Sequence, residues 1–477
     1  MRAHGFEPEF SPQAQQQLAA VVAHPPPIGP GADVRDLRQL LWSSIDNDTS
    51  RDLDQLEVVE HLSSGDTKVL VAIADVDAFV PPHSAIDNHA SNATTTVYTG
   101  VRNFPMLPEP LSTGATSLLE AQDRLSVVIE IVVSSEGAVH SGALYRAIVR
   151  NHAQLTYDAV GAWLEKRGPA PPKVAASTEL QAQLTEQDAC AQSLRRARYR
   201  HGALNIDTIE TRPVLLHGQV VAVARQNKNR ATELIEDFMI AANEVVAQTL
   251  EARHVSSIRR VVKTPERWDR IVALAATLGG ALPAAPNSQA LNEFLIARKA
   301  ADPDHFADLS LSVIKLMGPG EYLLERPGDP EPGHFGLAVQ DYTHSTAPNR
   351  RFADLVTQRL VKAALAGRPA PYGDDELAAI ARNCTLREDA ARKVEREMSK
   401  RIAAVAMSGR IGETFDAIVT GVTPRGTFVR VLTPHVEGML ARGQQGADVG
   451  DRVRVTLVGT DLQRGYIDFA RAAGPQA

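Results

Sequence analysis

The chain has few cysteines, no long apolar run and no signal-like start. Only Cys190 and Cys384 occur among 477 residues, and they lie too far apart to match a metal-ligand spacing. This argues against a disulfide framework, so a reduced, cytoplasmic compartment is expected. No segment approaches the roughly 20 apolar residues that span a bilayer, and residues 1–7 lack the apolar core of a signal peptide. We therefore expect a cytoplasmic protein with no membrane partner.

The chain also lacks a surplus of positive charge. It has 50 Lys and Arg against 57 Asp and Glu, a formal net charge of −7. A global basic field that attracts nucleic acid is thereby excluded, and any phosphate binding must come from local patches. The hydrophobic content of 44% and charged content of 22% are ordinary for a globular protein, and the length allows two or three domains.

What the chain does have is a dense acidic stretch at residues 45–57. Only Arg51 opposes its five carboxylates, which are Asp46, Asp48, Asp52, Asp54 and Glu57. Apolar segments flank it at residues 40–42 and 69–74. Carboxylates held between core segments repel one another unless a cation neutralises them, and hard oxygen ligands suit Mg²⁺, Mn²⁺ or Ca²⁺. A metal site is the first hypothesis, and a solvated acidic loop is the alternative.

The stretch also imitates an EF-hand loop, with Asp46 at position 1 and Glu57 at position 12. Two features argue against that site. Position 6, where the sharp turn needs glycine, is Arg51. The following segment, residues 69–76, is β-branched and predicts a strand instead of a helix.

The remaining pattern predicts a mixed α+β chain. Ser11 and Pro12 begin a helix that runs to about His24, and Pro-rich residues 25–30 end it. Strands are expected at residues 56–59, 69–76 and 125–133. Helices are expected at residues 159–166, 180–198, 231–253, 353–366 and 389–407.

The last sixty residues predict a small β-barrel of the OB type. Five short strands with glycine at the turns are expected at residues 415–422, 426–431, 436–440, 449–457 and 466–469. Phe428 is a candidate platform for stacking a base, and Arg452 and Arg454 give a basic face. A barrel with a packed Phe and solvated Arg side chains remains the alternative.

One basic pair stands out among several clusters. Arg350 and Arg351 follow a turn at residues 346–349 and open a predicted helix. Backbone N–H groups and guanidinium donors in that arrangement suit a phosphate.

Together these residues resemble the ribonuclease II / ribonuclease R family of 3′-to-5′ exoribonucleases. Residues 45–55 are similar to the family signature Ile-Asp-x5-Asp-x-Asp-Asp, and residues 347–355, Ala-Pro-Asn-Arg-Arg-Phe-Ala-Asp-Leu, are similar to its longest later block. Further matching blocks lie at residues 73–76, 98–108, 155–158, 236–243 and 334–343. The terminal barrel is similar to the S1-type OB domain that ends these nucleases.

The resemblance implies a fold, an activity and a set of site residues. The fold would be a mixed-sheet catalytic domain packed with helices around a buried RNA channel, followed by the barrel. The divisions would be an N-terminal arm at 1–34, the catalytic domain at 35–405 and the barrel at 410–477. The catalytic residues would be Asp54 and Arg350. The metal, Mg²⁺ or Mn²⁺, would be held by Asp46, Asp52, Asp54 and Gln55. The substrate, single-stranded RNA with a free 3′ end, would be bound by Tyr98, Tyr157, Glu236, Arg350, Glu395, Phe428, Arg452 and Arg454. The reaction would release nucleoside 5′-monophosphates processively, and a monomer is favoured.

Two departures from the family are visible. The signature ends in Asp-Asp, whereas this chain has Asp54-Gln55, so one carboxylate is missing from the expected metal site; Asp48 or Glu57 are candidates to compensate. About thirty-five residues stand where the family usually carries two cold-shock barrels. An active nuclease is the first hypothesis, and an RNA-binding regulator of the same fold that no longer cuts RNA is the alternative.

Overall fold

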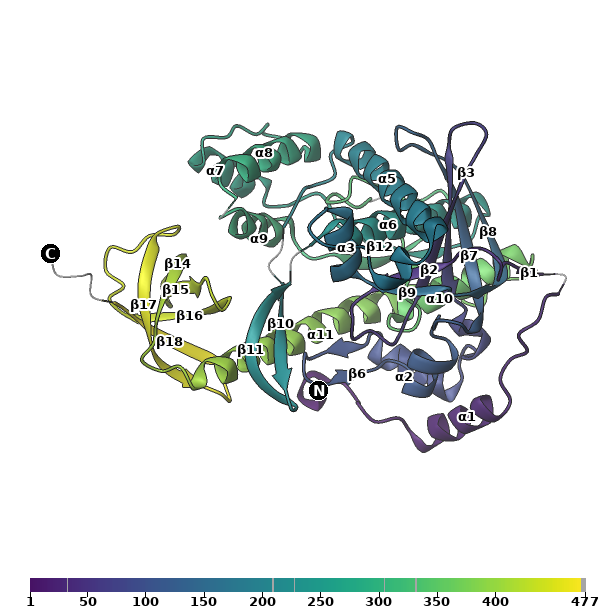
Figure 1. The fold of residues 1–477 in the computed structure, drawn as a ribbon, viewed down its shortest axis with the longest axis horizontal. Coiled ribbons are helices and arrows are strands. Elements are labelled where there is room, and N and C mark those ends of the chain that lie inside the picture. The colour runs from purple at the N-terminus through teal and green to yellow at the C-terminus, as the bar shows by residue number, and fades with distance from the viewer. Residues whose placement is uncertain (32, 208–209, 227, 304, 331–332, 473–477) are drawn as a thin grey trace.

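The computed structural model describes the chain apart from residues 32, 208–209, 227, 304, 331–332 and 473–477 (Figure 1). Its strands are β1 (Val34–Asp36), β2 (Ser43–Asp46), β3 (Gln55–His61), β4 (Thr67–Ala74), β5 (Val97–Tyr98), β6 (Asn103–Phe104), β7 (Asp123–Val133), β8 (Val139–Arg150), β9 (Ala153–Thr156), β10 (Glu210–Leu216), β11 (Gln219–Gln226), β12 (Ser257–Val261), β13 (Glu321–Glu325), β14 (Thr414–Thr423), β15 (Gly426–Val431), β16 (Val436–Arg442), β17 (Arg452–Asp461) and β18 (Tyr466–Arg471). Its α-helices are α1 (Pro12–Ala23), α2 (Ala85–Ala93), α3 (Tyr157–Leu164), α4 (Pro172–Ala175), α5 (Thr178–Arg200), α6 (Arg230–Ala252), α7 (Trp268–Thr277), α8 (Ser288–Ala301), α9 (Phe306–Met317), α10 (Phe352–Leu365) and α11 (Asp374–Ser408). Three short turns of helix, η1 (Arg2–His4), η2 (Val76–Ala78) and η3 (Pro110–Ala115), complete the set.

A seven-stranded mixed sheet, ordered β1-β8-β7-β4-β3-β2-β9, forms the centre of the larger domain. The edge strands β1 and β9 pair in parallel with β8 and β2, and the other neighbours are antiparallel. Residues 69–74 of β4 are all buried, because the sheet is covered there on both faces. That is why this strand has a continuous apolar run instead of an alternating one.

Helices α5 and α6 lie across the sheet, as Figure 1 shows. The approach of α6 is close: a Cβ added to Gly142 of β8 would lie 2.3 Å from Cγ1 of Val245 in α6. On α5, the Gln183 amide accepts a hydrogen bond from the Val59 N–H of β3 and donates one to the Val59 carbonyl, at 2.9 and 2.7 Å. These contacts fix the strand that follows the acidic stretch.

Helix α10 is anchored beyond the end of β4. Gln358 donates to the Ala74 carbonyl at 2.8 Å and accepts from the Asp77 N–H at 3.0 Å. The buried Lys362 ammonium lies 2.6 Å from a carboxylate oxygen of Asp75 and 2.7 Å from one of Asp77. The turn that precedes α10, which carries Arg350, is therefore held at the end of the sheet.

The 35-residue helix α11 joins the larger domain to a closed barrel ordered β14-β15-β16-β18-β17 (Figure 1). Ala404 and Met407, near the end of α11, are part of the barrel core. A second link runs from the barrel to α9, where the Arg430 Nη2 lies 2.7 Å from Oδ2 of Asp308. The barrel is thus packed against the larger domain as well as joined to it by α11.

Most predicted elements are confirmed, and the fold class is as expected: a mixed sheet with helices, followed by a five-stranded barrel. The Ser11 hydroxyl caps α1 by accepting from the Ala14 N–H at 3.2 Å. The helix expected at residues 389–407 is wrong at its start, since α11 begins at Asp374. The β10–β11 hairpin and the α7–α9 group were not predicted.

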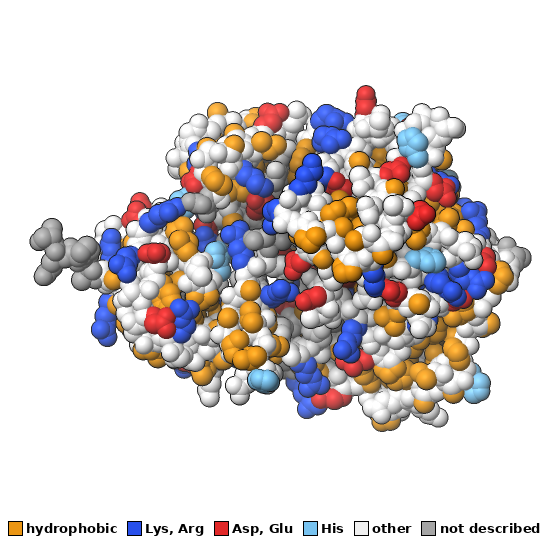
Figure 2. All heavy atoms as spheres, in the orientation of Figure 1, with side chains coloured by type: hydrophobic (Ala, Val, Ile, Leu, Met, Phe, Trp, Pro, Cys, Tyr) orange, Lys and Arg blue, Asp and Glu red, His pale blue; other side chains and the backbone are white. Residues whose placement is uncertain are grey.

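The surface shows no large patch of one charge on the face in Figure 2, where acidic and basic side chains are interspersed. Hydrophobic side chains gather on the β10–β11 hairpin, where Leu215, Leu216 and Val221 are exposed. In the part of the chain that the structure describes, no helix is long and apolar enough to cross a membrane.

Candidate active site

The acidic stretch forms the connection between β2 and β3. Asp46 ends β2, and Gln55 begins β3. The connection is pinned by Ser117, whose hydroxyl accepts from the Leu53 N–H at 3.0 Å and donates to the Arg51 carbonyl at 2.7 Å. Because strands flank the connection on both sides, the EF-hand is excluded.

Asp54 is buried at the centre of the site. Its Oδ1 accepts from the Asn349 N–H at 3.1 Å, and its Oδ2 accepts from Nε of Arg350 at 3.0 Å. Asn349 is itself held by Thr116, whose hydroxyl donates to its side-chain carbonyl at 2.6 Å. Burial raises the pKa of Asp54 to about 7 against the opposing effect of Arg350. The rest of the Arg350 side chain is not enclosed, since 43% of it is exposed.

Asp52 and Tyr98 form a second contact at the site. The Tyr98 hydroxyl donates to Oδ2 of Asp52 at 3.0 Å, and the Tyr98 N–H donates to the Glu395 carboxylate on α11 at 2.9 Å. Tyr98 is 39% exposed. Its ring therefore has an open face beside the carboxylates, on a backbone that α11 holds in place.

Asp46, Glu57 and Tyr157 interact electrostatically with one another. Asp46 Oδ1 accepts from the Asn47 N–H and from the Ser50 hydroxyl, both at 2.7 Å. Burial raises the pKa of Asp46, with the hydrogen bond from Ser50 opposing it. Burial and then the neighbouring Asp46 raise the pKa of Glu57 well above its usual range. Tyr157, the first residue of α3, is close enough for both carboxylates to raise its pKa, after burial, which is the larger cause.

The donor chemistry of this centre fits a hard divalent cation. In the described ranges of the chain, no three His, Cys, Asp or Glu side chains converge into a complete metal cage. Mg²⁺ does not need one, because it is usually bound by one or two carboxylates together with water and substrate phosphates. The two unpartnered oxygens of the buried Glu57 carboxylate are the observation that fits such an ion.

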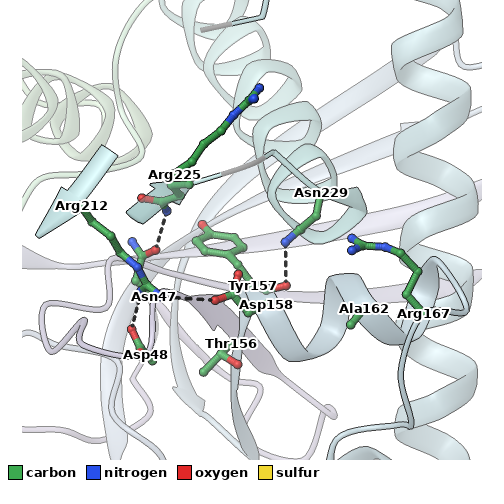
Figure 3. Close-up of a pocket in the computed structure, with 11 residues that line it drawn as sticks. Asn47, Asp48, Thr156, Tyr157, Asp158, Ala162, Arg167, Arg212, Arg225 and Asn229 are labelled. Atoms are coloured by element: carbon green, nitrogen blue, oxygen red, sulfur yellow. Dashed lines mark hydrogen bonds and ion pairs between the residues drawn. The ribbon is translucent and has the colours of Figure 1, made fainter. Parts of the chain in front are cut away.

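A cavity of about 300 Å³ opens beside Tyr157 (Figure 3). Arg212 and Arg225 from the β10–β11 hairpin, Arg167 and the Asn47 amide are among its lining groups. Arg212 lies 3.5 Å from the Asp48 carboxylate and 3.8 Å from that of Asp158. Nothing local in the sequence around Arg212 or Asn47 indicated that these side chains would line one cavity.

The structure separates the predicted site residues into groups. The first group lies at the acidic connection and consists of Asp46, Asp52, Asp54, Tyr98, Tyr157 and Arg350. Gln55 is at the start of β3, and the Glu395 carboxylate accepts a hydrogen bond from the Tyr98 backbone N–H. Glu236 lies on α6, where its carboxylate is 2.9 Å from Nζ of Lys228. Phe428 is on β15 and Arg452 and Arg454 are on β17 of the barrel, which is a separate domain from the one that holds the acidic connection (Figure 1).

Comparison with known proteins identifies two domains in this chain. The RNB domain matches residues 34–367, and the RNase II-type exonuclease C-terminal S1 domain matches residues 413–472. Ribonuclease R of Vibrio cholerae is 30% identical over 98% of this chain and 60% of its own length. Ribonuclease R of Escherichia coli is 28% identical over 100% of this chain and 62% of its own length. The chain therefore spans about 60% of the length of these curated relatives.

The fold is shared with solved structures of the same group. The apo form of Mycoplasma genitalium RNase R matches with a TM-score of 0.84 at 24% identity, over 99% of this chain and 77% of that one. Yeast Ssd1, a pseudonuclease, matches with a TM-score of 0.67 at 17% identity, over 86% of this chain and 51% of that one. Nucleases and a pseudonuclease thus share this architecture, so activity has to be argued from the site. Since the RNB domain covers well over half of its residues, the chain belongs to the ribonuclease II / ribonuclease R family of RNB-domain proteins.

Proposed function

We propose that this chain is a divalent-metal-dependent exoribonuclease. It would hydrolyse single-stranded RNA from a free 3′ end, processively, to nucleoside 5′-monophosphates. The observation that carries the proposal is the pairing of the buried Asp54 with Arg350 on the β2–β3 connection, where Asp46 and Asp52 interact electrostatically with the same groups. The ribonuclease R relatives, and the Mycoplasma genitalium RNase R structure with double-stranded RNA, support RNA as the substrate class.

The carboxylates would hold Mg²⁺, with Mn²⁺ as a substitute. A cation bound there would activate the attacking water and neutralise charge on the phosphate. Asp46 and Asp52 are the metal ligands of this proposal, and Asp54 the catalytic carboxylate that is also a ligand. Gln55, the fourth family position, has an amide oxygen, which is a weaker ligand than a carboxylate.

Arg350 would stabilise the charge that develops on the scissile phosphate. Only its Nε is bonded to Asp54, at 3.0 Å, and much of the side chain is exposed. Its terminal guanidinium nitrogens can therefore donate to phosphate oxygens while Asp54 fixes the direction of the side chain. A positioned donor of this kind needs no rearrangement when the reaction occurs.

Tyr98 and Tyr157 would position the 3′ end of the RNA. Tyr98 offers an exposed ring beside Asp52, which suits base stacking. Tyr157 borders the arginine-lined cavity of Figure 3, where guanidinium and amide groups suit the phosphates and ribose hydroxyls of the following nucleotides. Glu236 and Glu395 would make the further polar contacts with the strand.

We propose a division of labour along the chain. The arm at residues 1–34 would pack beside the catalytic domain at 35–405, and the barrel at 410–477 would add affinity for RNA through Phe428, Arg452 and Arg454. The protein would act in the cytoplasm as a monomer. Its two free, buried cysteines suit a reducing compartment.

The test is a pair of single-stranded RNAs, one labelled at the 5′ end and one at the 3′ end. With Mg²⁺, the 3′ label should appear at once as a mononucleotide, while the 5′-labelled strand should pass from full length to a short end product with few intermediates. EDTA should stop both reactions. Tight binding of both RNAs with no cleavage in Mg²⁺ or Mn²⁺ would contradict the proposal and favour a regulator that binds RNA without cutting it.

A further inference from the structure

Glu57 has an unusual environment for a carboxylate. It lies on β3, its backbone pairs with Ser43 of β2 and Val71 of β4, and its exposed fraction is 0%. Neither oxygen of its carboxylate has a hydrogen-bond partner among the residues that the structure describes. An isolated charge in such a place is strongly unfavourable, so buried carboxylates are normally paired or bound to a metal.

Glu57 faces the acidic centre. Side chains of alternate strand residues point to the same face of a sheet, so Glu57 shares its face with Gln55, the position where the family signature has a carboxylate. Asp46 and Tyr157 both interact electrostatically with Glu57. Two buried carboxylates in mutual repulsion create a site for a cation.

The other candidate, Asp48, does not share this environment. Its side chain is 61% exposed and lies 3.5 Å from the Arg212 guanidinium. Asp52 and Asp54 already accept hydrogen bonds from Tyr98 and Arg350. Asp46 makes both of its hydrogen bonds through Oδ1.

We propose that Glu57 joins Asp46 in ligating the divalent cation, so that Glu57 supplies the carboxylate that Gln55 lacks. This inference rests on the proposed metal-dependent function and deepens it. Mg²⁺ is usually bound by a few carboxylates together with water and phosphate oxygens, so Glu57 would add one ligand to the set that includes Asp52 and Asp54. The metal site of this chain would thus keep the negative charge that Gln55 does not supply.

The test is Mn²⁺ binding to the full chain without RNA, followed by electron paramagnetic resonance of the free ion. Glu57→Gln should weaken binding at least about tenfold, since even the loss of an outer-shell partner costs about 10- to 100-fold. Glu60→Gln is the matched control, because Glu60 lies on the same strand but its carboxylate is 39% exposed and paired with Lys68; its affinity should equal that of wild type. Adding Gln55→Asp to Glu57→Gln should recover most of the lost affinity.

Thermal melting in EDTA separates ligand loss from misfolding. Glu57→Gln removes a buried carboxylate without changing its shape, so its melting temperature without metal should equal or exceed that of wild type, while the stabilisation by Mn²⁺ should shrink. Equal Mn²⁺ affinity in wild type and Glu57→Gln would overturn this inference and leave the proposed function standing. A wild type that binds no Mn²⁺ would overturn both.

Discussion

At the scale of single residues, the site is defined by how each carboxylate is compensated. Asp54 is held by the Asn349 N–H and Arg350, and Asp52 by the Tyr98 hydroxyl. Asp46 is bonded within its own connection, and Glu57 has no partner in the described structure. The protein groups therefore neutralise only part of the negative charge of the site.

His334, in the segment that precedes Arg350, should make the stability of the folded protein depend on pH in mild acid. Burial, and then Arg260, lower the pKa of His334 to about 4. An unfolded chain binds this proton below about pH 6.5, whereas the folded protein keeps the ring neutral, so stability is lost as pH falls from about 6.5 towards 4. His334→Asn keeps an acceptor for the Leu337 N–H, which His334 Nδ1 accepts at 3.1 Å, but does not titrate.

We expect wild type to lose stability relative to His334→Asn, on the order of 1 kcal/mol, between pH 7 and pH 5. Urea unfolding of both proteins at the two pH values measures this difference. His344 is present in both proteins; burial is the main cause that lowers its pKa, and His334 makes one of the smaller contributions. Parallel losses in the two proteins would show that His334 is already protonated when folded, or does not titrate differently on unfolding.

At the scale of elements, the sequence predicted what local pattern determines. The β-branched runs of β3, β4 and β7 and the apolar spacing of α5, α6 and α10 were found at nearly the right residues. The contacts of Asn349 with Thr116 and Asp54 were not predicted. They join residues that are 233 and 295 positions apart in the sequence, and no local pattern encodes them. The same holds for Arg212, which reaches the site only through the packing of the β10–β11 hairpin.

The packing of α6 on the sheet gives a prediction at this scale. Gly142→Ala should destabilise the protein by about 1–3 kcal/mol, because the added methyl group would overlap Val245 and force β8 and α6 apart. Gly114→Ala is the control, since a Cβ there meets no atom within 4 Å. The midpoints of urea unfolding of the two variants test this destabilisation. Equal midpoints would mean that α6 and β8 lie further apart than the structure places them.

At the scale of the whole molecule, α11 determines what can be tested separately. Glu395, in the second half of this helix, positions Tyr98, and Ala404 and Met407, near its end, are part of the barrel core. Removing the barrel would expose those side chains next to the helix that supports the site. Substitutions on the barrel surface therefore test its role more cleanly than a deletion.

The variant Phe428→Ala with Arg452→Ala and Arg454→Ala should weaken the binding of long single-stranded RNA. Loss of two phosphate contacts should also lower the salt slope of binding by about 1.4, at about 0.7 per contact for single strands. Turnover of a short, saturating oligomer should be unchanged, because the acidic connection lies in the other domain. Fluorescence anisotropy over a salt series and a single-turnover assay measure the two effects. An unchanged salt slope would show that the barrel face does not contact RNA.

Asp54→Asn tests the central claim, metal-assisted cleavage at the β2–β3 connection, most directly. Asparagine keeps an oxygen to accept from the Asn349 N–H, so the fold should persist, but the charge at the centre of the site is lost. End-labelled RNA and Mg²⁺ should show turnover reduced at least about a hundredfold, which corresponds to about 2.7 kcal/mol in the activation barrier. Affinity for the same RNA should stay within about twofold of wild type. Near-normal cleavage by Asp54→Asn would contradict the account.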